Sequence, residues 1–509
     1  MNTTESATAG LQENEQFRAP SEVRSLGAYR EAFDALTEGM PASDRGQVDD
    51  ALIIYLRKVF ERSGQPTGQP AQVVAGLNAD IARIDTLISA QLNEILHDSE
   101  FQALEASWRG LESLAVNSGL QAGRLEIKVL NLSKEELVEH LNEYKGNTTL
   151  ESPLYETFYR KNLGVLGGAP IGCLVGDFYF DHSTEDVLAL EGMSKLAAAC
   201  HAPFISSVKP ELFGVTDWSL LRDKSDVAIW NHFETSQAHN QWKSLRKDHD
   251  AALLAFTMFR VLGREVYQKA KGFEFREETE GKSNNYLWVN SVFAMAENLA
   301  AAFFKYDWPV QIRGIEGGGL LKRLPQHVVG PGHGADGVVG PVEVVTPNEL
   351  ESVLSKLGFL PLLHIQNTAD AVFIGAQSLQ DPQSFFGPDG VSATENAELH
   401  ARLPYTLAAC RILHFVTRLA QNKIGSLYSA PELQRLLTDW LNQYIEPNPD
   451  LVSEEQRRKK PLRAAEVIVV PVPGKPGYYD IKLKIRPHYQ FEGAGVDLSL
   501  SSRVGQDKK

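Results

Sequence analysis

The sequence HDSEFQALEASWRGLESL, residues His97–Leu114, has the pattern of an amphipathic helix. Its large apolar side chains recur three or four residues apart, which places them on one helix face: Phe101, Leu104, Trp108 and Leu111. Ser99 followed by Gln102 has the pattern of a capping box, which satisfies backbone N–H groups at a helix start. We therefore predict a helix that begins near Ser99 and buries this apolar face.

Helical periodicity also marks the residues before this stretch. Asp49–Arg62 has a helical pattern, Gln65–Pro70 is a linker rich in Pro, Gly and Gln, and another helix follows. The apolar residues on one face of that helix are Ile81, Ile84, Ile88, Leu92 and Ile95. The residues before Gly39 form a polar tail with one amphipathic segment, whose shared helix face holds Leu26, Tyr29, Phe33 and Leu36.

The middle of the chain alternates between strand-like and helix-like segments. Two helices are expected to begin at capping boxes, one at Ser133 with Glu136 and one at Thr346 with Glu349. Further helices are expected in a stretch that ends at Ala199 and at Leu287–Phe304, and the expected strands are Leu125–Leu130, Ile171–Phe180, Phe204–Val208, Leu360–His364 and Ala371–Ile374. This alternation predicts a mostly buried, mixed or parallel sheet.

The C-terminal part combines two helices with a β-rich tail. The helices are expected near Leu403–Gln421 and Pro431–Tyr444, and the charged stretch Ser453–Lys460 separates them from a strand at Val467–Val472. Two further strands alternate apolar with polar residues, and their apolar positions are Ile481, Leu483 and Ile485 in one, and Val496, Leu498 and Leu500 in the other. An alternation of period two predicts strands with one buried and one wet face.

Composition excludes several classes of function. Of the 509 residues, 43% are hydrophobic and 23% charged, as in ordinary globular proteins, and the net charge of -15 argues against non-specific binding to nucleic acid. The polar N-terminus lacks a signal sequence and no apolar run reaches the roughly 18 residues of a membrane helix, so we expect a cytoplasmic protein without direct membrane insertion. Cys173, Cys200 and Cys410 lie in apolar stretches and are expected to be buried free thiols.

A search for catalytic or cofactor motifs finds only weak matches. Gly332–Gly337 matches the dinucleotide pattern G-x-G-x-x-G, but a strand-like segment follows it where a helix should begin. Gly281-Lys282-Ser283 resembles the end of a phosphate-binding loop, but Arg276 stands where the leading glycine should be. His232 and His239 have no partner pattern for a metal. We therefore expect no catalytic residue, no metal and no cofactor, and a protein that is not an enzyme.

Several segments together resemble the large subunit of type VI secretion contractile sheaths, the TssC or VipB family. The first is His97–Leu114, in which Phe101, Gln102, Trp108, Arg109 and Gly110 match family positions and are implied to be structural. Other matches are Ile171–Phe178, Gly314–Leu320, Leu403–Tyr405, Lys423–Ser426, Trp440–Asn442, Arg463–Ala465, Pro473–Tyr479 and Arg486–His488. They run from about Asp80 to Val504, and their order and number carry the resemblance.

The sequence also departs from the family pattern at two places. Met258–Arg264 differs from the family's usual Arg-Leu-Pro-Tyr-Gly segment, and Gln421-Asn422 stands where the family has Arg-Asp. Family contacts made by those residues are therefore not transferred to this chain.

The resemblance implies a mixed α/β, contractile tail-sheath-like fold with N-terminal helices, a central mixed sheet and a C-terminal β-meander. It implies three parts: an N-terminal helical arm and linker at residues 1–70, central α/β sheath domains with an inserted outer domain at 71–400, and C-terminal helices with a strand-exchange tail at 401–509. The expected role is structural.

The resemblance also implies partners. They are a small sheath subunit, neighbouring sheath protomers, an inner tube of Hcp protein, a baseplate and a ClpV-type AAA+ unfoldase. Residues Ile481, Leu483, Ile485, Val496, Leu498 and Leu500 are candidates for strand exchange between subunits. The candidates for unfoldase binding are Leu26, Tyr29, Phe33 and Leu36. The alternative is that their helix packs on its own subunit or on the small subunit.

Two alternatives remain open. One is the sheath of another phage-tail-like contractile particle, which would be distinguished by not needing a small partner subunit. The other is a nucleotide-using enzyme built around Gly332–Gly337, which would bind nucleotide as the purified protein.

Overall fold

The computed structural model describes residues 34, 40–63, 70–118, 123–165, 167–221, 224–268, 273, 275–328, 338–387, 390–423, 429–448, 451–474, 478–487 and 498–504. These residues form two compact units. The first contains the described residues up to His97 together with those of 266–278, and the second contains Asp98–Glu265 and the described residues from Thr279 onward.

The described part of the first unit contains the helices α3 (Ala42–Ser63) and α4 (Pro70–Leu96). The Tyr55 hydroxyl on α3 donates a hydrogen bond to the Asp80 carboxylate on α4 at 2.7 Å. Near the end of α4, the backbone N–H of Glu278 donates to the side-chain oxygen of Asn93 at 3.2 Å. The apolar residues that the sequence places on one face of α4 are exposed to solvent: Ile81, Ile84, Ile88 and Ile95.

A six-stranded sheet forms the centre of the second unit. Its strand order is β1 (Leu174–Phe180), β2 (Phe204–Val208), β3 (Leu254–Met258), β9 (Phe359–His364), β10 (Ala371–Phe373) and β6 (Leu320–Leu321). The first four strands pair in parallel, and β10 runs antiparallel to both of its neighbours. The prediction of a buried mixed sheet is confirmed, because every residue of β2 and β3 is buried.

Helices connect and cover these strands. α8 (Thr184–Cys200) follows β1, and α9 (Asp226–Thr235) and α10 (Asn240–Lys247) lie between β2 and β3. α8 packs on α6 (Lys134–Glu143) and α10, whereas α11 (Ser291–Tyr306) packs on β1, β2, β3 and α5 (Ser99–Asn117). α12 (Asn348–Lys356) packs on β9. Two short pairs complete this part: β4 (Val261–Leu262) with β5 (Trp288–Val289), and β7 (His327–Val328) with β8 (Val338–Val339).

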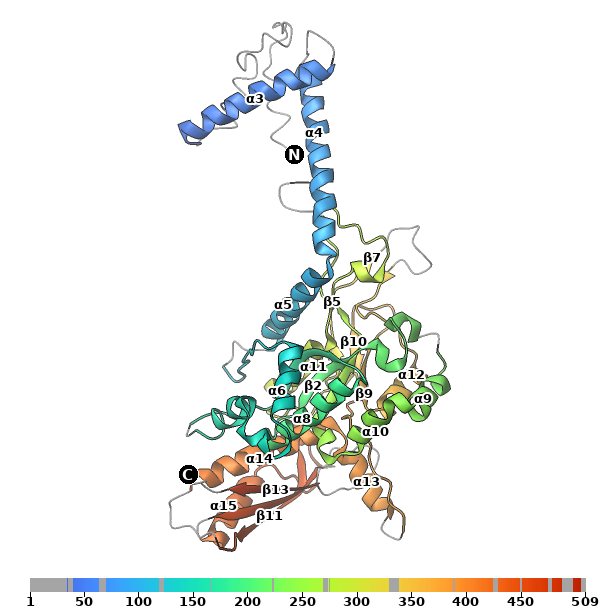
Figure 1. Cartoon of the computed structure of the whole chain (residues 1–509). Helices are drawn as coiled ribbons and strands as arrows, with labels where there is room; N and C mark the ends of the chain where they lie inside the picture. Colours follow the sequence, from blue (N-terminus) through green and yellow to red (C-terminus); the bar gives the residue numbers. More distant parts are fainter. Residues whose placement is uncertain are drawn as a thin grey trace. The chain divides into compact units, whose positions relative to one another are not determined.

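The C-terminal part of the second unit is a three-stranded antiparallel sheet with helices packed on it (Figure 1). Its helices are α13 (Gly390–His400), α14 (Leu403–Gln421), α15 (Ala430–Asn442) and α16 (Glu454–Lys459). Its strands are β11 (Leu462–Pro471), β12 (Tyr479–Pro487) and β13 (Leu498–Val504), with β12 in the centre. The predicted bounds of α14 are confirmed.

Two hydrophobic cores lie in the second unit, and α14 contributes to both. Leu403 and Leu407 belong to the core around the six-stranded sheet. Ile412 and Val416, one and two turns farther along α14, belong to the core under the C-terminal sheet and are fully buried. α14 therefore joins the two layers of this unit.

Some of the local predictions are wrong. Residues 125–130 form no strand, and α5 is capped by Asp98 rather than Ser99: the Asp98 carboxylate accepts hydrogen bonds from the N–H groups of Glu100 and Phe101. α12 begins after Pro347 without a side-chain cap. The capping box of Ser133 with Glu136 is confirmed, since each side chain accepts from the other residue's backbone N–H.

Gly110 lets α5 approach α11 closely. A Cβ atom at position 110 would lie 2.3 Å from a ring carbon of Phe293 on α11, well inside van der Waals contact. The aromatic ring is itself buried in the main core, so it has little room to move.

We predict that Gly110→Ala lowers the free energy of unfolding by about 1–3 kcal/mol, because the added methyl overpacks this helix contact. Denaturant unfolding measures the effect. Gly172→Ala is the matched control, since a Cβ at position 172 meets nothing within 4 Å, and its change is expected to stay within about 0.5 kcal/mol. Equal stability of both variants would contradict the proposed close contact.

Candidate assembly site

Polar side chains along one side of α5 make directional contacts with the rest of the second unit. The Gln102 side-chain amide donates to the backbone carbonyl of Asn284 at 3.1 Å. One turn on, the Glu105 carboxylate accepts from Arg109 at 2.7 Å and from Arg264 at 2.9 Å. The next residue, Gly110, packs closely against the ring of Phe293. These residues fix α5 on the second unit through directional contacts.

The glutamate at the middle of this face is largely buried. The Glu105 side chain is 13% exposed and that of Arg264 is 7% exposed, so the ion pair lies away from bulk water. An ion pair of this kind is strongly coupled, because each buried charge depends on the other for compensation.

The outer face of α5 carries the large apolar residues, contrary to the sequence-based prediction that they are buried. Phe101 is 39%, Leu104 59% and Trp108 65% exposed, and only Leu111 packs on the core. The reason is that a different stripe, Ala106, Gly110 and Leu114, faces the core, and its small residues Ala106 and Gly110 allow α11 to approach. Exposed apolar residues that share one helix face are typical of a protein–protein contact.

A polar network ties α5 to the sheet. The Ser107 hydroxyl donates to the Asp177 carboxylate on β1 at 2.5 Å, and the Asn290 amide donates to the same carboxylate at 3.0 Å. Asn290 also caps α11 and accepts from the hydroxyl of Ser207 on β2. Since these groups bond to one another, their hydrogen-bonding capacity is used to hold helices and strands together.

Charged groups at the ends of the parallel strands are likewise paired. Arg260, directly after β3, donates two hydrogen bonds to Glu343 at 2.8 and 2.5 Å. Burial alone would lower the pKa of Arg260, but the bonds to Glu343 outweigh it and raise the pKa. Asp181, after β1, has a pKa lowered to about 2: partial burial opposes the shift, and hydrogen bonds from Ser183 and Lys209 outweigh it.

Three histidines meet beside β1, of which the sequence indicated two. The ring of His239 stacks on His182 at 4.6 Å and lies 5.0 Å from His232. Burial lowers the pKa of His239, with smaller contributions from the other two rings and Lys243, against a hydrogen bond to the Leu212 carbonyl. Within the described ranges, no group of three or more His, Cys, Asp or Glu residues is placed to hold a metal ion.

The three cysteines are free thiols. Cys200 and Cys410 are buried and Cys173 is partly buried, and burial raises the pKa of each to about 12. Thiols of so high a pKa are unreactive at neutral pH.

The C-terminal sheet holds three of the six strand-exchange candidates in its described core. Ile481, Leu483 and Ile485 on β12 are at most 2% exposed. Leu498 and Leu500 lie on β13, opposite Ile485 and Leu483 in the strand register, and Val496 lies outside the described residues. β12 is therefore a central strand, hydrogen-bonded on both sides.

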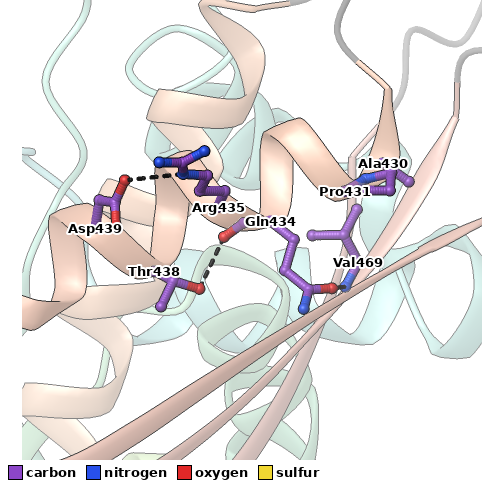
Figure 2. A pocket seen from close by; sticks show the side chains of 7 residues that line it. All are labelled: Ala430, Pro431, Gln434, Arg435, Thr438, Asp439 and Val469. Carbon is purple, nitrogen blue, oxygen red and sulfur yellow. Dashed lines mark hydrogen bonds and ion pairs between the residues drawn. The ribbon is translucent and has the colours of Figure 1, made fainter.

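The outer edge of β11 is partly covered. At one end, Leu462 exchanges backbone hydrogen bonds with Tyr444 and Glu446. At the other end, the Gln434 side chain of α15 accepts a hydrogen bond from the backbone N–H of Val469 at 3.1 Å. Figure 2 shows this contact beside the other residues that line the pocket. The pocket is open, has a volume of about 400 Å³ and lies between α15 and β11. This contact was not predicted from the sequence.

Some candidates cannot be placed. The proposed unfoldase-binding residues Leu26, Tyr29, Phe33 and Leu36, and the glycines of 332–337, lie outside the described residues. In the part of the chain that the structure describes, no helix combines the length and apolar content needed to cross a membrane.

Comparison with known protein families identifies this arrangement. A family model described as "EvpB/VC_A0108, tail sheath N-terminal domain" matches residues 78–380, and one described as "EvpB/VC_A0108, tail sheath gpW/gp25-like domain" matches residues 392–504. The chain belongs to this tail sheath family. The first match covers the six-stranded sheet, and the second covers α14, α15 and the C-terminal sheet. The tail-sheath resemblance seen in the sequence is therefore confirmed.

A characterised relative agrees with this assignment. The chain is 40% identical over 480 residues to the "Type VI secretion system sheath protein TssC1" of Pseudomonas aeruginosa, a match that covers 93% of this chain and 95% of that protein. Among solved structures, the chain has a TM-score of 0.32 at 10% identity to one described as the cryo-EM structure of the anti-feeding prophage baseplate, covering 76% of this chain and 80% of that one. A similarity this low carries no argument.

In this tail sheath protein we predict that Glu105→Ala lowers the free energy of unfolding by roughly 3 kcal/mol, because the buried Arg264 loses this carboxylate. Chemical denaturation measures the loss. Glu112→Ala removes an exposed carboxylate from the same helix and serves as the control, with an expected change below about 0.5 kcal/mol. If the two variants were equally stable, the pair would not anchor α5.

Proposed function

We propose that the protein is the large subunit of a type VI secretion contractile sheath. In this proposal it pairs with a small sheath subunit, and the pairs assemble into a tube around Hcp whose contraction propels effectors. The observation that carries the proposal is that the two tail-sheath models together span residues 78–504 with a gap of only residues 381–391. The relative named as a type VI sheath protein is matched over nearly its whole length.

The proposed role is mechanical and cytoplasmic, with no reaction assigned. The further proposed partners are neighbouring sheath protomers, the baseplate and a ClpV-type unfoldase, without a nucleic acid or cofactor. Residues 1–70 are proposed as the helical arm, 71–400 as the central domains and 401–509 as the strand-exchange part. The alternative, a sheath of another phage-tail-like particle, is favoured only if tubes form without a small subunit.

The outer face of α5 supports assembly through side chains. Phe101, Leu104 and Trp108 are exposed on one face, while Gln102, Glu105 and Arg109 on the neighbouring side hold α5 in place. We infer that this apolar face is covered by another sheath subunit, because water contact with three large apolar side chains is unfavourable.

The C-terminal sheet supports assembly through backbone bonds. β13 pairs with β12 alone within the described residues, and residues 488–497 connect the two strands. A strand at the end of a sheet can be replaced by the same strand of a neighbouring copy, because the exchanged strand makes the same hydrogen bonds. The ten connecting residues can span at most about 33–36 Å when extended.

The register of β12 and β13 provides a direct test of strand exchange. Val469 turns its backbone groups away from β12, so its partner Ile481 turns its own backbone groups away from β11. Because this direction alternates along a strand, the β12 residues that turn their backbone groups toward β11 are Asp480, Lys482 and Lys484. Lys482 and Ser501 are therefore a non-hydrogen-bonded pair of β12 and β13. Such pairs have close Cα atoms, within the range that a disulfide can bridge.

We predict that the variant Lys482→Cys with Ser501→Cys forms an intramolecular disulfide in the free subunit and intermolecular disulfides in assembled sheaths. Co-expression with the small subunit, oxidation of purified tubes and non-reducing electrophoresis measure this, with a ladder of linked chains as the expected result. Each single-cysteine variant controls for other pairings. Only monomeric bands from intact tubes would contradict strand exchange.

For the N-terminal segment, we predict that Leu26→Asp with Phe33→Asp abolishes copurification with a ClpV-type unfoldase while tubes still form. The charges would disrupt the apolar face expected to lie in a groove of the unfoldase. Glu31→Gln, between the two positions, is the control. Negative-stain microscopy checks assembly, and unchanged unfoldase binding would exclude this segment as the binding site.

A further inference from the structure

β11 is one of the two edge strands of the C-terminal sheet, the other being β13. β12 is flanked on both sides, whereas the outer side of β11 pairs with no further strand among the described residues, apart from the backbone bridge at Leu462. An unpaired edge presents a row of backbone N–H and C=O groups and is a template for strand addition. In a protein that exchanges strands, two free subunits can pair wrongly before assembly, because a strand of one copy fits the sheet edge of another.

The backbone geometry shows which groups of β11 face outward. The N–H of Val469 leaves the sheet toward Gln434, so the odd-numbered residues of this stretch turn their backbone groups away from β12. Val472 fits the same alternation, since its N–H is bonded to Tyr478 on the inner side. The outward positions are therefore Ala465, Val467, Val469 and Pro471.

Two of these four positions are closed to an incoming strand. Pro471 has no backbone N–H to donate. The N–H of Val469 is occupied by the Gln434 side chain. Ala465 and Val467 remain, which is too short a ladder to offset the entropy of ordering a strand.

The position of Gln434 is fixed by the helix that carries it. α15 begins at a capping box formed by Ser429 and Glu432, which defines its first turn. Its neighbour Leu433 and the following Leu437 are at most 4% exposed in the core beneath the sheet. Gln434 therefore reaches the strand edge from a rigid helix (Figure 2).

We propose that Gln434 caps the β11 edge of the free subunit and keeps it from accepting the β13 strand of a second copy. This rests on the proposed function only in that β13 must be able to leave its own β12. β13 is the fitting occupant because its seven residues, Leu498–Val504, fit within the regularly paired stretch of β11 from Ala464 to Pro471. A strand in the groove would have to displace the Gln434 amide from Val469.

The test compares two replacements of similar size. Gln434→Met keeps the volume but loses the acceptor, whereas Gln434→Glu keeps an oxygen that can accept from Val469. We expect the Val469 amide to exchange with solvent roughly fivefold faster in Gln434→Met, the factor that corresponds to a hydrogen bond of about 1 kcal/mol. Gln434→Glu is expected to exchange like the wild type. An unchanged exchange rate of the Val469 amide in Gln434→Met would overturn the proposal that Gln434 caps this edge, independently of the behaviour of β13.

Self-association of the subunit without its partner tests the consequence. By sedimentation velocity, we expect Gln434→Met to associate at a roughly fivefold lower concentration than the wild type and Gln434→Glu. Thermal unfolding of all three checks that the fold is retained. Faster exchange of Val469 without stronger association would overturn the role of Gln434 against strand addition.

The disulfide pair of β12 and β13 identifies the incoming strand. In the background of Lys482→Cys with Ser501→Cys, oxidation locks β13 to its own β12. We expect Gln434→Met to associate when this pair is reduced and to stay monomeric when it is oxidised. Association that persists after locking would mean a different occupant and would overturn the proposal. A ladder from intact tubes tests strand exchange separately, so the two failures are distinguishable.

Discussion

The burial of α14 is the constraint on which the second unit depends. Leu403 and Leu407 at its start pack in the core of the six-stranded sheet, and Ile412 and Val416 pack under the C-terminal sheet. Each such side chain stabilises the fold by about 1.5–3 kcal/mol when fully buried. Because one continuous helix supplies both sets, neither core can form completely without the other. The two regions matched by separate family models are thus mechanically joined.

Polar contacts along α14 reinforce this joint. His414 bonds through its ring to the backbone carbonyl of Cys200 at 2.9 Å, at the end of α8. Arg418 donates to three backbone carbonyls, those of Leu163, Val165 and Gly168, before β1. Carbonyl groups in a loop or at a helix end otherwise lack partners, so these bonds satisfy both sides. A force on the C-terminal sheet is therefore passed to the six-stranded sheet through a packed helix rather than through a flexible link. This property supports the proposed role in a contractile tube, where subunits move as rigid bodies.

The sequence correctly predicted strands in which one face is buried and the other is exposed to solvent. β12 alternates Ile481, Leu483 and Ile485 with charged residues, and the structure confirms a strand with these three residues buried. It failed on α5, because Phe101, Leu104 and Trp108 outweigh in size the small stripe that packs inside. A large apolar side chain is not always buried within its own subunit. The close packing of α5 on α11 depends instead on the absence of a side chain at Gly110.

The edge of β11 could not have been predicted, for a different reason. Gln434 and Val469 are 35 positions apart, and a single glutamine has no pattern that reveals which backbone group it bonds. The contact exists because α14 and the apolar face of α15 place that glutamine over the strand end. The family match identifies the chain as a sheath protein but says nothing of this contact. Under the proposed strand exchange, a side chain that occupies a single N–H group of a sheet edge has more influence on assembly than its small contribution to stability indicates.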